Sequence, residues 1–340
     1  MHTTTFASHF TKHWAVRRRQ VLMAIASAMA LSQSAHSQQS DVFPTRAIRL
    51  VVPVSPGGPA DQIARAFGDK LRLELGQPII IDNRPGAAGS LGTAQVLQAP
   101  ADGYTLLVSL PSAQITAPLL MEKPTFDGVK DFTPIGRFGH FTAVLLVNET
   151  VPASSFKDLL AFAKQHPGKL NYASTGLGGL PHLTTELLKM REGLDILHVP
   201  YRGGAPAVQA LVANEAQVMF GEITTALPWI RQKRLKALAV ASETRSPLLP
   251  DVPTLTEVGM KDAPGSSWIG LAGPPGMSAA IVERLNQALV KASQHKEIVQ
   301  TFKERGAEPA PSSPSEFRAL WVEDQRRWRN VIQTNHIRAE

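Results

Sequence analysis

The chain of 340 residues contains no cysteine. This absence excludes disulfide bonds, thiolate nucleophiles and cysteine-rich metal sites together. A chain without disulfide bonds has to be stabilised by a large hydrophobic core. The length is sufficient to bury such a core, and it favours two domains.

Excess positive charge is also small once residues 1–37 are set apart. Of the 35 basic residues four lie in that segment, so 31 remain against 28 acidic residues, a net charge of +3. The sequence shows no clustered basic face of the kind that nucleic-acid-binding domains carry. We therefore expect no nucleic-acid partner.

No apolar run approaches the roughly 20 residues that a membrane-spanning helix needs. The run at 21–31 follows Arg17, Arg18 and Arg19 and precedes Ala35-His36-Ser37, which supplies the small residues of a signal-peptidase site. We expect residues 1–37 to be a signal peptide that directs export by the Sec or the Tat pathway. We also expect that the mature chain does not span a membrane. A buried N-terminal helix is the alternative interpretation.

Common nucleotide and metal motifs are missing as well. The chain has no GxxxxGK[ST] phosphate loop, and its 176–179 run lacks the full GxGxxG spacing. His140, His182 and His198 do not have the i, i+4 spacing of a helical zinc pair. We expect no metal and no cofactor, and we interpret His182 and His198 as structural.

Catalytic signals are weak. No GxSxG nucleophile elbow is present. Ser55, Ser109, Ser112 and Ser174 lie at loop mouths, where a hydroxyl suits hydrogen bonding to a carboxylate as well as nucleophilic attack. Because the sequence shows no credible base for any of them, binding is favoured over catalysis.

Short β-rich runs alternate with amphipathic helical patterns, which predicts an α/β fold with largely parallel sheets. In the clearest unit, residues 47–54 form a strand, 55–60 a loop, and Asp61 stands where a helix N-cap belongs. Apolar residues then recur every four positions until Gly76. Further strands are expected at 78–82, 104–109, 169–174, 196–201, 217–220 and 236–241, and helices at 90–98, 181–192, 206–213, 224–232, 279–293, 297–305 and 314–332.

Several glycine-rich loops follow the C-terminal ends of these strands. Ligands of open α/β sheets bind in the crevice outside those ends. A helix N-terminus there offers unpaired N–H groups to an anion, and glycine lets the backbone approach closely. Any one such loop is more often a simple turn, but the set, drawn from two domains, predicts a site that encloses a small anion.

The loops and their flanking strands resemble, in this order, the Bug family of extracytoplasmic solute receptors, the substrate-binding components of tripartite tricarboxylate transporters. The matching stretches cover essentially the whole mature chain. They are 44–53 (PTRAIRLVVP), 56–65 (PGGPADQIAR), 75–78 (LGQP), 83–89 (NRPGAAG), 102–106 (DGYTL), 131–135 (DFTPI), 172–176 (YASTG), 181–183 (PHL), 198–207 (HVPYRGGAPA), 238–240 (LAV) and 250–254 (PDVPT).

The resemblance implies a two-domain periplasmic-binding-protein fold, a Venus flytrap with a ligand cleft between the domains. Domain 1 is then discontinuous, with residues 38–141 and 263–340, and domain 2 spans residues 142–262. It also implies a periplasmic receptor that captures a small carboxylate and delivers it to permease subunits in the membrane. Such a receptor is not an enzyme, and we expect a monomer.

The resemblance also carries over binding loops by position, at 55–61, 83–90 and 109–113 in domain 1 and at 174–179, 201–205 and 221–222 in domain 2. The candidate ligand-binding residues are Ser55, Pro56, Gly57, Gly58, Pro59, Ala60, Asp61, Gly86, Ala87, Ser109, Ser112, Ser174, Thr175, Gly176, Leu177, Gly178, Tyr201, Arg202, Gly203, Gly204, Gly221 and Glu222. Arg202 either neutralises a ligand carboxylate or is a solvated loop cation. Arg65 is interpreted as a structural ion-pair partner.

The sequence departs from the family at two places that face the cleft. Leu177 and Gly179 stand where many members carry Asn and Ser or Thr, and Gly221-Glu222 replace an Asp-Asn pair. Glu222 meets a ligand ammonium or hydroxyl, repels a second carboxylate, or faces solvent. These changes disfavour a citrate-like ligand and leave a less polar acid plausible.

Two other functions stay open at this point. A periplasmic hydrolase of a small carboxylate or ester would use a loop serine as nucleophile. A ligand-sensing module would share the fold and the binding chemistry of the receptor but would signal to a partner.

Overall fold

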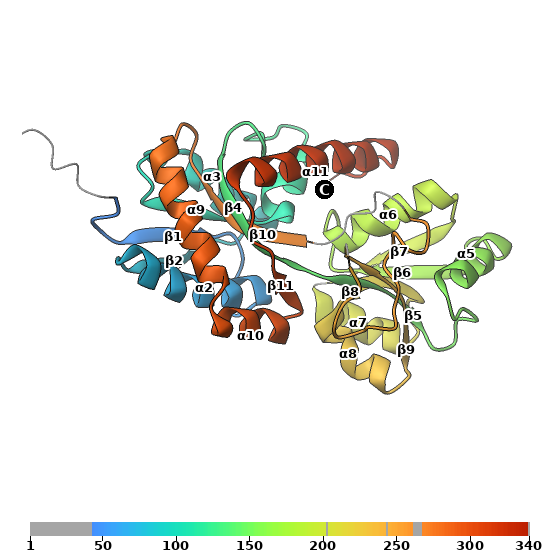
Figure 1. The fold of residues 1–340 in the computed structure, drawn as a ribbon. Coiled ribbons are helices and arrows are strands. Elements are labelled where there is room, and N and C mark those ends of the chain that lie inside the picture. Colours follow the sequence, from blue (N-terminus) through green and yellow to red (C-terminus); the bar gives the residue numbers. More distant parts are fainter. Residues whose placement is uncertain (1–42, 202, 243, 261–266, 339–340) are drawn as a thin grey trace, which may run out of the picture. The chain divides into compact units, whose positions relative to one another are not determined.

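The computed structural model describes residues 43–201, 203–242, 244–260 and 267–338 (Figure 1). The predicted signal peptide and Arg202 lie outside the described residues. Within the described ranges, no helix combines the length and the apolar character that crossing a membrane requires.

The first sheet contains six strands among the described residues. It has the order β11-β4-β10-β3-β1-β2, in which β1 runs parallel to β2 and β3 and the other pairs are antiparallel. The strands are β1 (Ile48–Val52), β2 (Ile79–Asn83), β3 (Thr105–Ser109), β4 (Thr133–Phe141), β10 (Ser267–Gly273) and β11 (Ala307–Pro309).

The second sheet has the order β7-β6-β8-β5-β9, with β6 parallel to β7 and β8 and with β5 antiparallel to β8 and β9. Its strands are β5 (Ala143–Asn148), β6 (Leu170–Ser174), β7 (Ile196–Pro200), β8 (Val218–Glu222) and β9 (Leu235–Ala241). Two sheets with helices confirm the predicted α/β class.

The expectation of largely parallel sheets is wrong for part of each sheet. Strands β4 and β5, which carry the chain from one sheet to the other, pair only with antiparallel neighbours. Antiparallel pairs need no helical crossover, so a search for alternating strands and helices does not find them.

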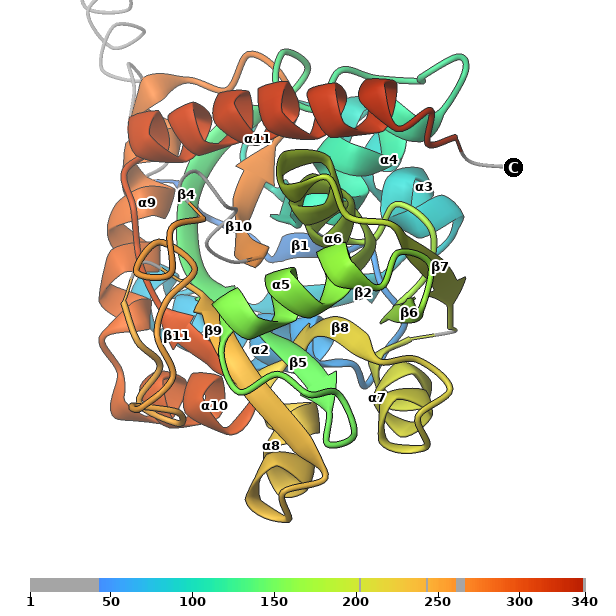
Figure 2. The ribbon, with the colours of Figure 1, turned by 90° about the vertical axis from the view of Figure 1, so that its right-hand side faces the viewer.

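Helices cover both sheets (Figures 1 and 2). The first sheet packs against α2 (Pro59–Leu75), α3 (Ser90–Leu97), α9 (Ala279–Ser293), α10 (Lys296–Glu304) and α11 (Pro314–Thr334), and the second against α6 (Leu180–Glu192), α7 (Gly204–Val212) and α8 (Ile223–Arg231). Helix α4 (Ala117–Leu120) contacts α11, and α5 (Phe156–Gln165) lies between β5 and β6 in the chain. The short turns η1 (Ala87–Gly89) and η2 (Ser112–Thr116) precede α3 and α4.

Helix α2 shows how the apolar pattern fixes an element. Ile63, Phe67 and Leu71 are buried on one face, as their spacing of four residues predicts, and Gly76 ends the helix in the left-handed region. The N-cap is Gly58, so the prediction that Asp61 is the N-cap is wrong. Asp61 is the third helical residue, because Pro59 suits the first helical position and begins the helix earlier.

Helix α11 is held to β10 by an aromatic cluster. Trp268 of β10 lies 5.1 Å from Phe317 of α11 between ring centroids, in edge-to-face geometry. The Trp268 indole N–H donates to Asp324 Oδ2 at 2.7 Å, and Arg327 donates to the other oxygen at 2.7 Å. Burial raises the pKa of Asp324 to about 6. Helix α11 also contacts α6, which packs on the second sheet (Figure 2).

The chain passes between the sheets twice, from β4 to β5 and between β9 and β10. The first passage falls at Thr142, between adjacent strands of different sheets. The second lies between Ala241 and Ser267, and residues 261–266 of that stretch lie outside the described residues. The domain boundaries at 141/142 and 262/263 therefore stay a prediction.

Candidate functional site

A cavity of about 800 Å³ lies between the loops of the two sheets. Its lining includes segments from both: the loop after β1, the β4–β5 junction, the start of α6, the loop before α7 and the end of β8. A second cavity of about 360 Å³ adjoins it and shares Val54, Ser55, Ser112, Thr175 and Gly179 with it. The shared residues mark where the two cavities meet.

Four helices begin at the wall of the main cavity. Their N-cap residues are Gly58 of α2, Gly179 of α6, Gly203 of α7 and Glu222 of α8, and all four line the cavity. None of these residues caps its helix with a side-chain hydrogen bond. The first-turn N–H groups of four helices, and the partial positive charge of each N-terminus, therefore surround one space.

The side chains that line the main cavity are apolar or carry hydroxyl groups, with one carboxylate. Neither cavity has Lys, Arg or His among its described lining residues. The hydroxyl groups belong to Ser55, Ser112, Thr142, Thr175, Thr184 and Ser267. Hydroxyls and backbone N–H groups donate hydrogen bonds without a formal charge, a combination that suits a small carboxylate in a partly apolar space.

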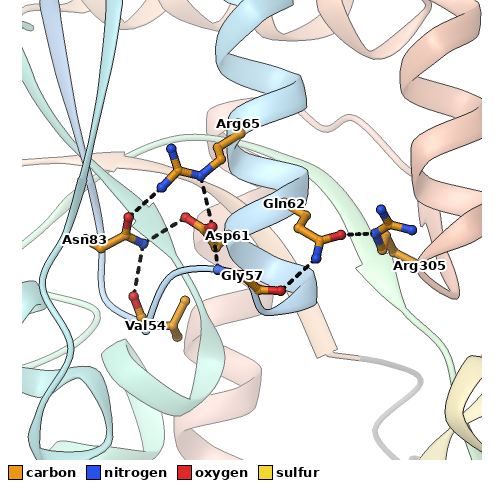
Figure 3. Close-up of polar contacts among 7 residues, drawn as sticks. All are labelled: Val54, Gly57, Asp61, Gln62, Arg65, Asn83 and Arg305. Atoms are coloured by element: carbon orange, nitrogen blue, oxygen red, sulfur yellow. Dashed lines mark hydrogen bonds and ion pairs between the residues drawn. The ribbon is translucent and has the colours of Figure 1, made fainter.

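The loop that begins α2 is held by Asp61, which is only 1% exposed (Figure 3). Asp61 Oδ2 accepts from the Gly57 N–H at 2.8 Å and from Arg65 Nε at 2.9 Å, and Oδ1 accepts from Asn83 Nδ2 at 2.8 Å. Burial alone raises the pKa of Asp61, but these hydrogen bonds outweigh it and lower the pKa below its usual value. Asp61 therefore holds the loop in place without lining either cavity. Arg65 forms an ion pair with Asp61, in line with the structural ion-pair role predicted for it.

Two amide side chains, those of Asn83 and Gln62, tie the same loop to its neighbours. Asn83 donates to the Val54 carbonyl at 3.1 Å and accepts from Arg65 at 2.8 Å. Gln62 donates to the Gly57 carbonyl at 2.6 Å and accepts from Arg305 (Figure 3). The chain at Gly57 is thus fixed from both of its polar groups before a ligand arrives.

The loop before α3 has an unusual backbone at the wall of the second cavity. Four consecutive residues, from Gly86 to Gly89, have positive φ angles, including Ala87 at 45° and Ala88 at 54°. Such angles cost a non-glycine residue about 1–3 kcal/mol each and persist where the surroundings enforce them, often at binding sites. At Gly89 a Cβ would lie 2.6 Å from the Ala113 Cβ, so only glycine fits between this loop and η2.

The loop after β6 is supported by a stack of three rings. His198 lies between Tyr172 and His182, with centroid distances of 4.8 and 4.1 Å. His182 Nδ1 accepts from the Gly178 N–H at 2.9 Å, which requires that nitrogen to be unprotonated. Burial, and then the neighbouring His198, lower the pKa of His182 to about 4. The predicted structural role of both histidines thus has a physical basis, since they hold the 174–179 loop.

One serine does have a base beside it. Ser174 Oγ lies 2.7 Å from His198 Nε2, and the same Oγ contacts the Gly176 carbonyl and N–H. Ser174 is 0% exposed and lines neither cavity. A nucleophile has to reach its substrate, so this pair is better explained as support of the loop than as a catalytic dyad.

Glu222 is exposed, but it lines a cavity that the protein encloses. Its side chain is exposed to the space of the main cavity, yet protein surrounds that space and the resulting desolvation raises the pKa of Glu222. Among the described residues no cation contributes to offset this shift. The carboxylate is therefore available to a ligand.

The candidate residues from the sequence divide into three groups. Lining the main cavity are Ser55, Pro56, Gly58, Pro59, Ala60, Ser112, Thr175, Gly203, Gly204, Gly221 and Glu222, and lining the second are Gly86, Gly176, Leu177 and Gly178. Lining neither are Gly57, Asp61, Ala87, Ser109, Ser174 and Tyr201.

The residues of this last group that have polar side chains serve the loops instead. Ser109 is buried and donates to Gln114 Oε1 at 2.5 Å, and the Tyr201 hydroxyl donates to Glu215 at 3.3 Å. Arg202 lies outside the described residues. Sequence reasoning missed Phe141, Thr142 and Ala143, which line the cavity where the chain changes sheets. No local motif marks that junction, and only the predicted boundary at 141/142 points to it.

Within the described ranges, no group of three or more His, Asp or Glu side chains is arranged to hold a metal ion. The described wall of the site thus consists of helix N-termini, hydroxyl groups and apolar side chains, with the carboxylate of Glu222 among them.

Comparison with known proteins agrees with this picture. The sequence model of one family, described as "Tripartite tricarboxylate transporter family receptor", matches residues 63–337. The chain is 34% identical to the protein BugT of Bordetella pertussis over 92% of this chain and 97% of BugT.

Two solved structures from Rhodopseudomonas palustris are similar throughout. One, with adipate, has 32% identity and a TM-score of 0.73 over 87% of this chain and 99% of the other. The second, MatC with bound malate, has 32% identity and a TM-score of 0.69 over 85% of this chain and 100% of the other. These likenesses confirm the predicted family and the periplasmic-binding-protein fold, and they support a role in solute binding.

Proposed function

The chain belongs to the tripartite tricarboxylate transporter receptor family, and on this basis we propose that it is a periplasmic receptor for a small carboxylate. The receptor captures the acid in the cleft between the two sheets and delivers it to permease subunits in the membrane. It releases its ligand unchanged and performs no chemical step.

A single observation carries the carboxylate assignment: four helix N-termini without side-chain caps line one cavity. Backbone N–H groups at a helix N-terminus donate to an anion, and the helix dipole stabilises its charge. The hydroxyls in the wall supply further donors. A carboxylate thus completes hydrogen bonds that the protein leaves open.

The size of the space favours a small acid. About 800 Å³ falls within the usual range for small-molecule pockets, and the mostly apolar wall accommodates a short carbon chain. The bound acids named for the two similar structures, adipate and malate, are consistent with this class.

Thermal unfolding with a panel of acids tests the proposal. The protein, produced from its full sequence and freed of co-purified ligand, is heated with butyrate, hexanoate, succinate, adipate, malate, citrate, glutamate and benzoate, and with the matching alcohols as controls. A ligand at 100 times its dissociation constant stabilises a protein by about 2.7 kcal/mol. For a chain of this size that raises Tm by several degrees.

The proposal expects at least one acid to raise Tm while its alcohol does not, and mass spectrometry to recover the acid unchanged. Folded, ligand-free protein that responds to no acid would contradict the carboxylate assignment. Conversion of a bound ester or acid to a product would contradict the receptor role.

A further inference from the structure

The wall of the main cavity contains one ionisable side chain among its described residues, the carboxylate of Glu222. A receptor for an anion has no use for a negative charge there, because it repels the ligand. At 4 Å two like charges repel by about 1 kcal/mol even in bulk water, and by more in a confined space. The negative charge of Glu222 is therefore compatible with ligand binding only if a positively charged group lies beside it.

The protein does not use this carboxylate for its own folding. Glu222 is the N-cap of α8 but makes no side-chain cap hydrogen bond. The Thr225 hydroxyl donates to its backbone carbonyl at 2.8 Å, not to its carboxylate. No ion pair within the described residues involves its carboxylate, whereas Glu149 and Glu192 of the same half are paired with Arg234 and Lys164.

The strands beside Glu222 leave it uncovered. In the second sheet Glu222 of β8 pairs with Ala143 of β5, which pairs with Ala241 of β9. Residues opposite each other in register point to the same face, and all three line the main cavity. The two methyl groups of Ala143 and Ala241 lie in one row on the β5 side of Glu222, so a ligand group of moderate size can lie above them and reach the carboxylate.

We propose that Glu222 selects ligands that carry a positively charged nitrogen in addition to their carboxylate. This inference rests on the proposed carboxylate receptor and specifies its ligand class as zwitterionic acids. The carboxylate of the ligand binds the open helix N-termini, and its ammonium group binds Glu222. A dicarboxylate of the same length places its second charge against Glu222 and is disfavoured.

The raised pKa of Glu222 agrees with this arrangement. Desolvation without a cation disfavours the charged form of a carboxyl group, and an adjacent ammonium reverses that effect. The ligand-free cavity therefore holds a destabilised charge that a zwitterion neutralises.

Three acids of equal chain length test the inference by calorimetric titration: hexanoate, adipate and 6-aminohexanoate. They differ only in the terminal group, which is apolar, anionic or cationic. The protein is produced from its full sequence as wild type, Glu222→Gln and Glu222→Asp. Glu122→Gln is the matched control, because Glu122 is exposed and lines neither cavity.

Wild type is expected to bind 6-aminohexanoate at least tenfold more tightly than adipate. Glu222→Gln is expected to reduce that ratio at least tenfold, to weaken 6-aminohexanoate and strengthen adipate, and to change hexanoate by less than threefold. Glu222→Asp and Glu122→Gln are expected to keep the preference for the ammonium acid. A merely structural role would change all three acids together.

The inference is overturned, and the proposed function kept, if wild type prefers adipate, or if Glu222→Gln binds acids with the wild-type ratio. Failure of every acid to bind every variant would overturn the proposed function and this inference with it.

Discussion

Two groups of helices in this protein begin differently. Helices α5, α9 and α11 begin at Ser155, Ser278 and Ser313, whose side chains accept the N–H of the third helical residue. These serines line neither cavity. Helices α2, α6, α7 and α8, which begin at the main cavity, have no such cap.

The difference shows what the cavity is built for. A Ser N-cap stabilises a helix by about 1 kcal/mol relative to Ala, and Gly in its place loses only a few tenths. A glycine N-cap at α2, α6 and α7 therefore costs little stability, and it leaves their first-turn N–H groups without a side-chain cap. The three serine-capped helices each satisfy one of these groups within the protein.

The largest effect is expected from the network that positions the first of the open helices. Asp61→Ala removes three hydrogen bonds from a buried carboxylate and is expected to destabilise the protein by about 2–3 kcal/mol and to weaken acid binding. Urea unfolding and titration measure the two effects. Asp69→Ala, an exposed change on the same helix, is expected to alter stability by less than about 0.5 kcal/mol.

This effect has a defined pH dependence. The folded-state pKa of Asp61 is lowered, so its stabilisation is complete above the ordinary pKa of about 4 and is lost as pH falls through the lowered folded-state value. The stability difference between wild type and Asp61→Ala should shrink as the solution is acidified below about pH 4. A difference that grew on acidification would contradict the assignment of the Asp61 network.

A capped cavity helix should lose its ligand. At Gly58 the backbone angles suit any residue and a Cβ meets nothing within 4 Å. Gly58→Asp supplies a cap and a negative charge, and it is expected to weaken acid binding at least 30-fold, or by about 2 kcal/mol. Gly58→Ala offers neither and should weaken binding less than threefold. Equal affinities for the two variants would refute the role of this N-terminus.

Removal of a serine cap away from the cavities should change stability and leave acid affinity unchanged, the reverse of adding a cap at the cavity. Ser313 accepts from the Glu316 N–H while the Glu316 side chain accepts from the Ser313 N–H, a complete capping box. Ser313→Ala is expected to lower stability by about 1 kcal/mol and to leave acid affinity unchanged. Chemical denaturation and titration of the same preparation measure both, and a loss of affinity would erase the distinction between the two groups of helices.

The sequence predicted the parts of the site that local chemistry controls. The unit of β1, its loop and α2 could be read because a buried strand, a proline-glycine loop and an apolar stripe each leave a local pattern. The hydrogen bonds of Asp61 could not be predicted in this way, because its partner Asn83 lies 22 residues later in the chain, in β2. Its role depends on which strands become neighbours.

Strands β4 and β10 were not predicted from the sequence, for a different reason. Strands β4 and β10 contain Gly139 and Gly270, at which a Cβ would lie 2.0 Å from Phe302 and 2.5 Å from Phe317 respectively. Glycine in a strand breaks the β-rich pattern, and here it is needed because aromatic rings from distant helices pack on the backbone. Sequence pattern alone does not reveal such long-range packing.

The smallest effect is expected at the second cavity. Leu177 is 44% exposed and lines that cavity, and Leu177→Asn is expected to weaken hexanoate two- to fourfold, since partial burial of a leucine contributes less than about 1 kcal/mol. Leu197→Asn is the matched control, because Leu197 is 64% exposed and lines neither cavity. Equal effects of the two changes would remove the second cavity from the ligand site.

The central claim is that a carboxylate binds the open helix N-termini, and the amides of the N-cap glycines, next to those open N–H groups, report on a ligand bound there. With [¹⁵N]glycine labelling, the amide signals of Gly58, Gly179 and Gly203 should shift in step with saturation by the tightest acid. Those of Gly76 and Gly193, which end the helices α2 and α6, should stay in place. Binding that leaves the three N-cap amides unmoved, or that moves the helix C-termini instead, would contradict the account.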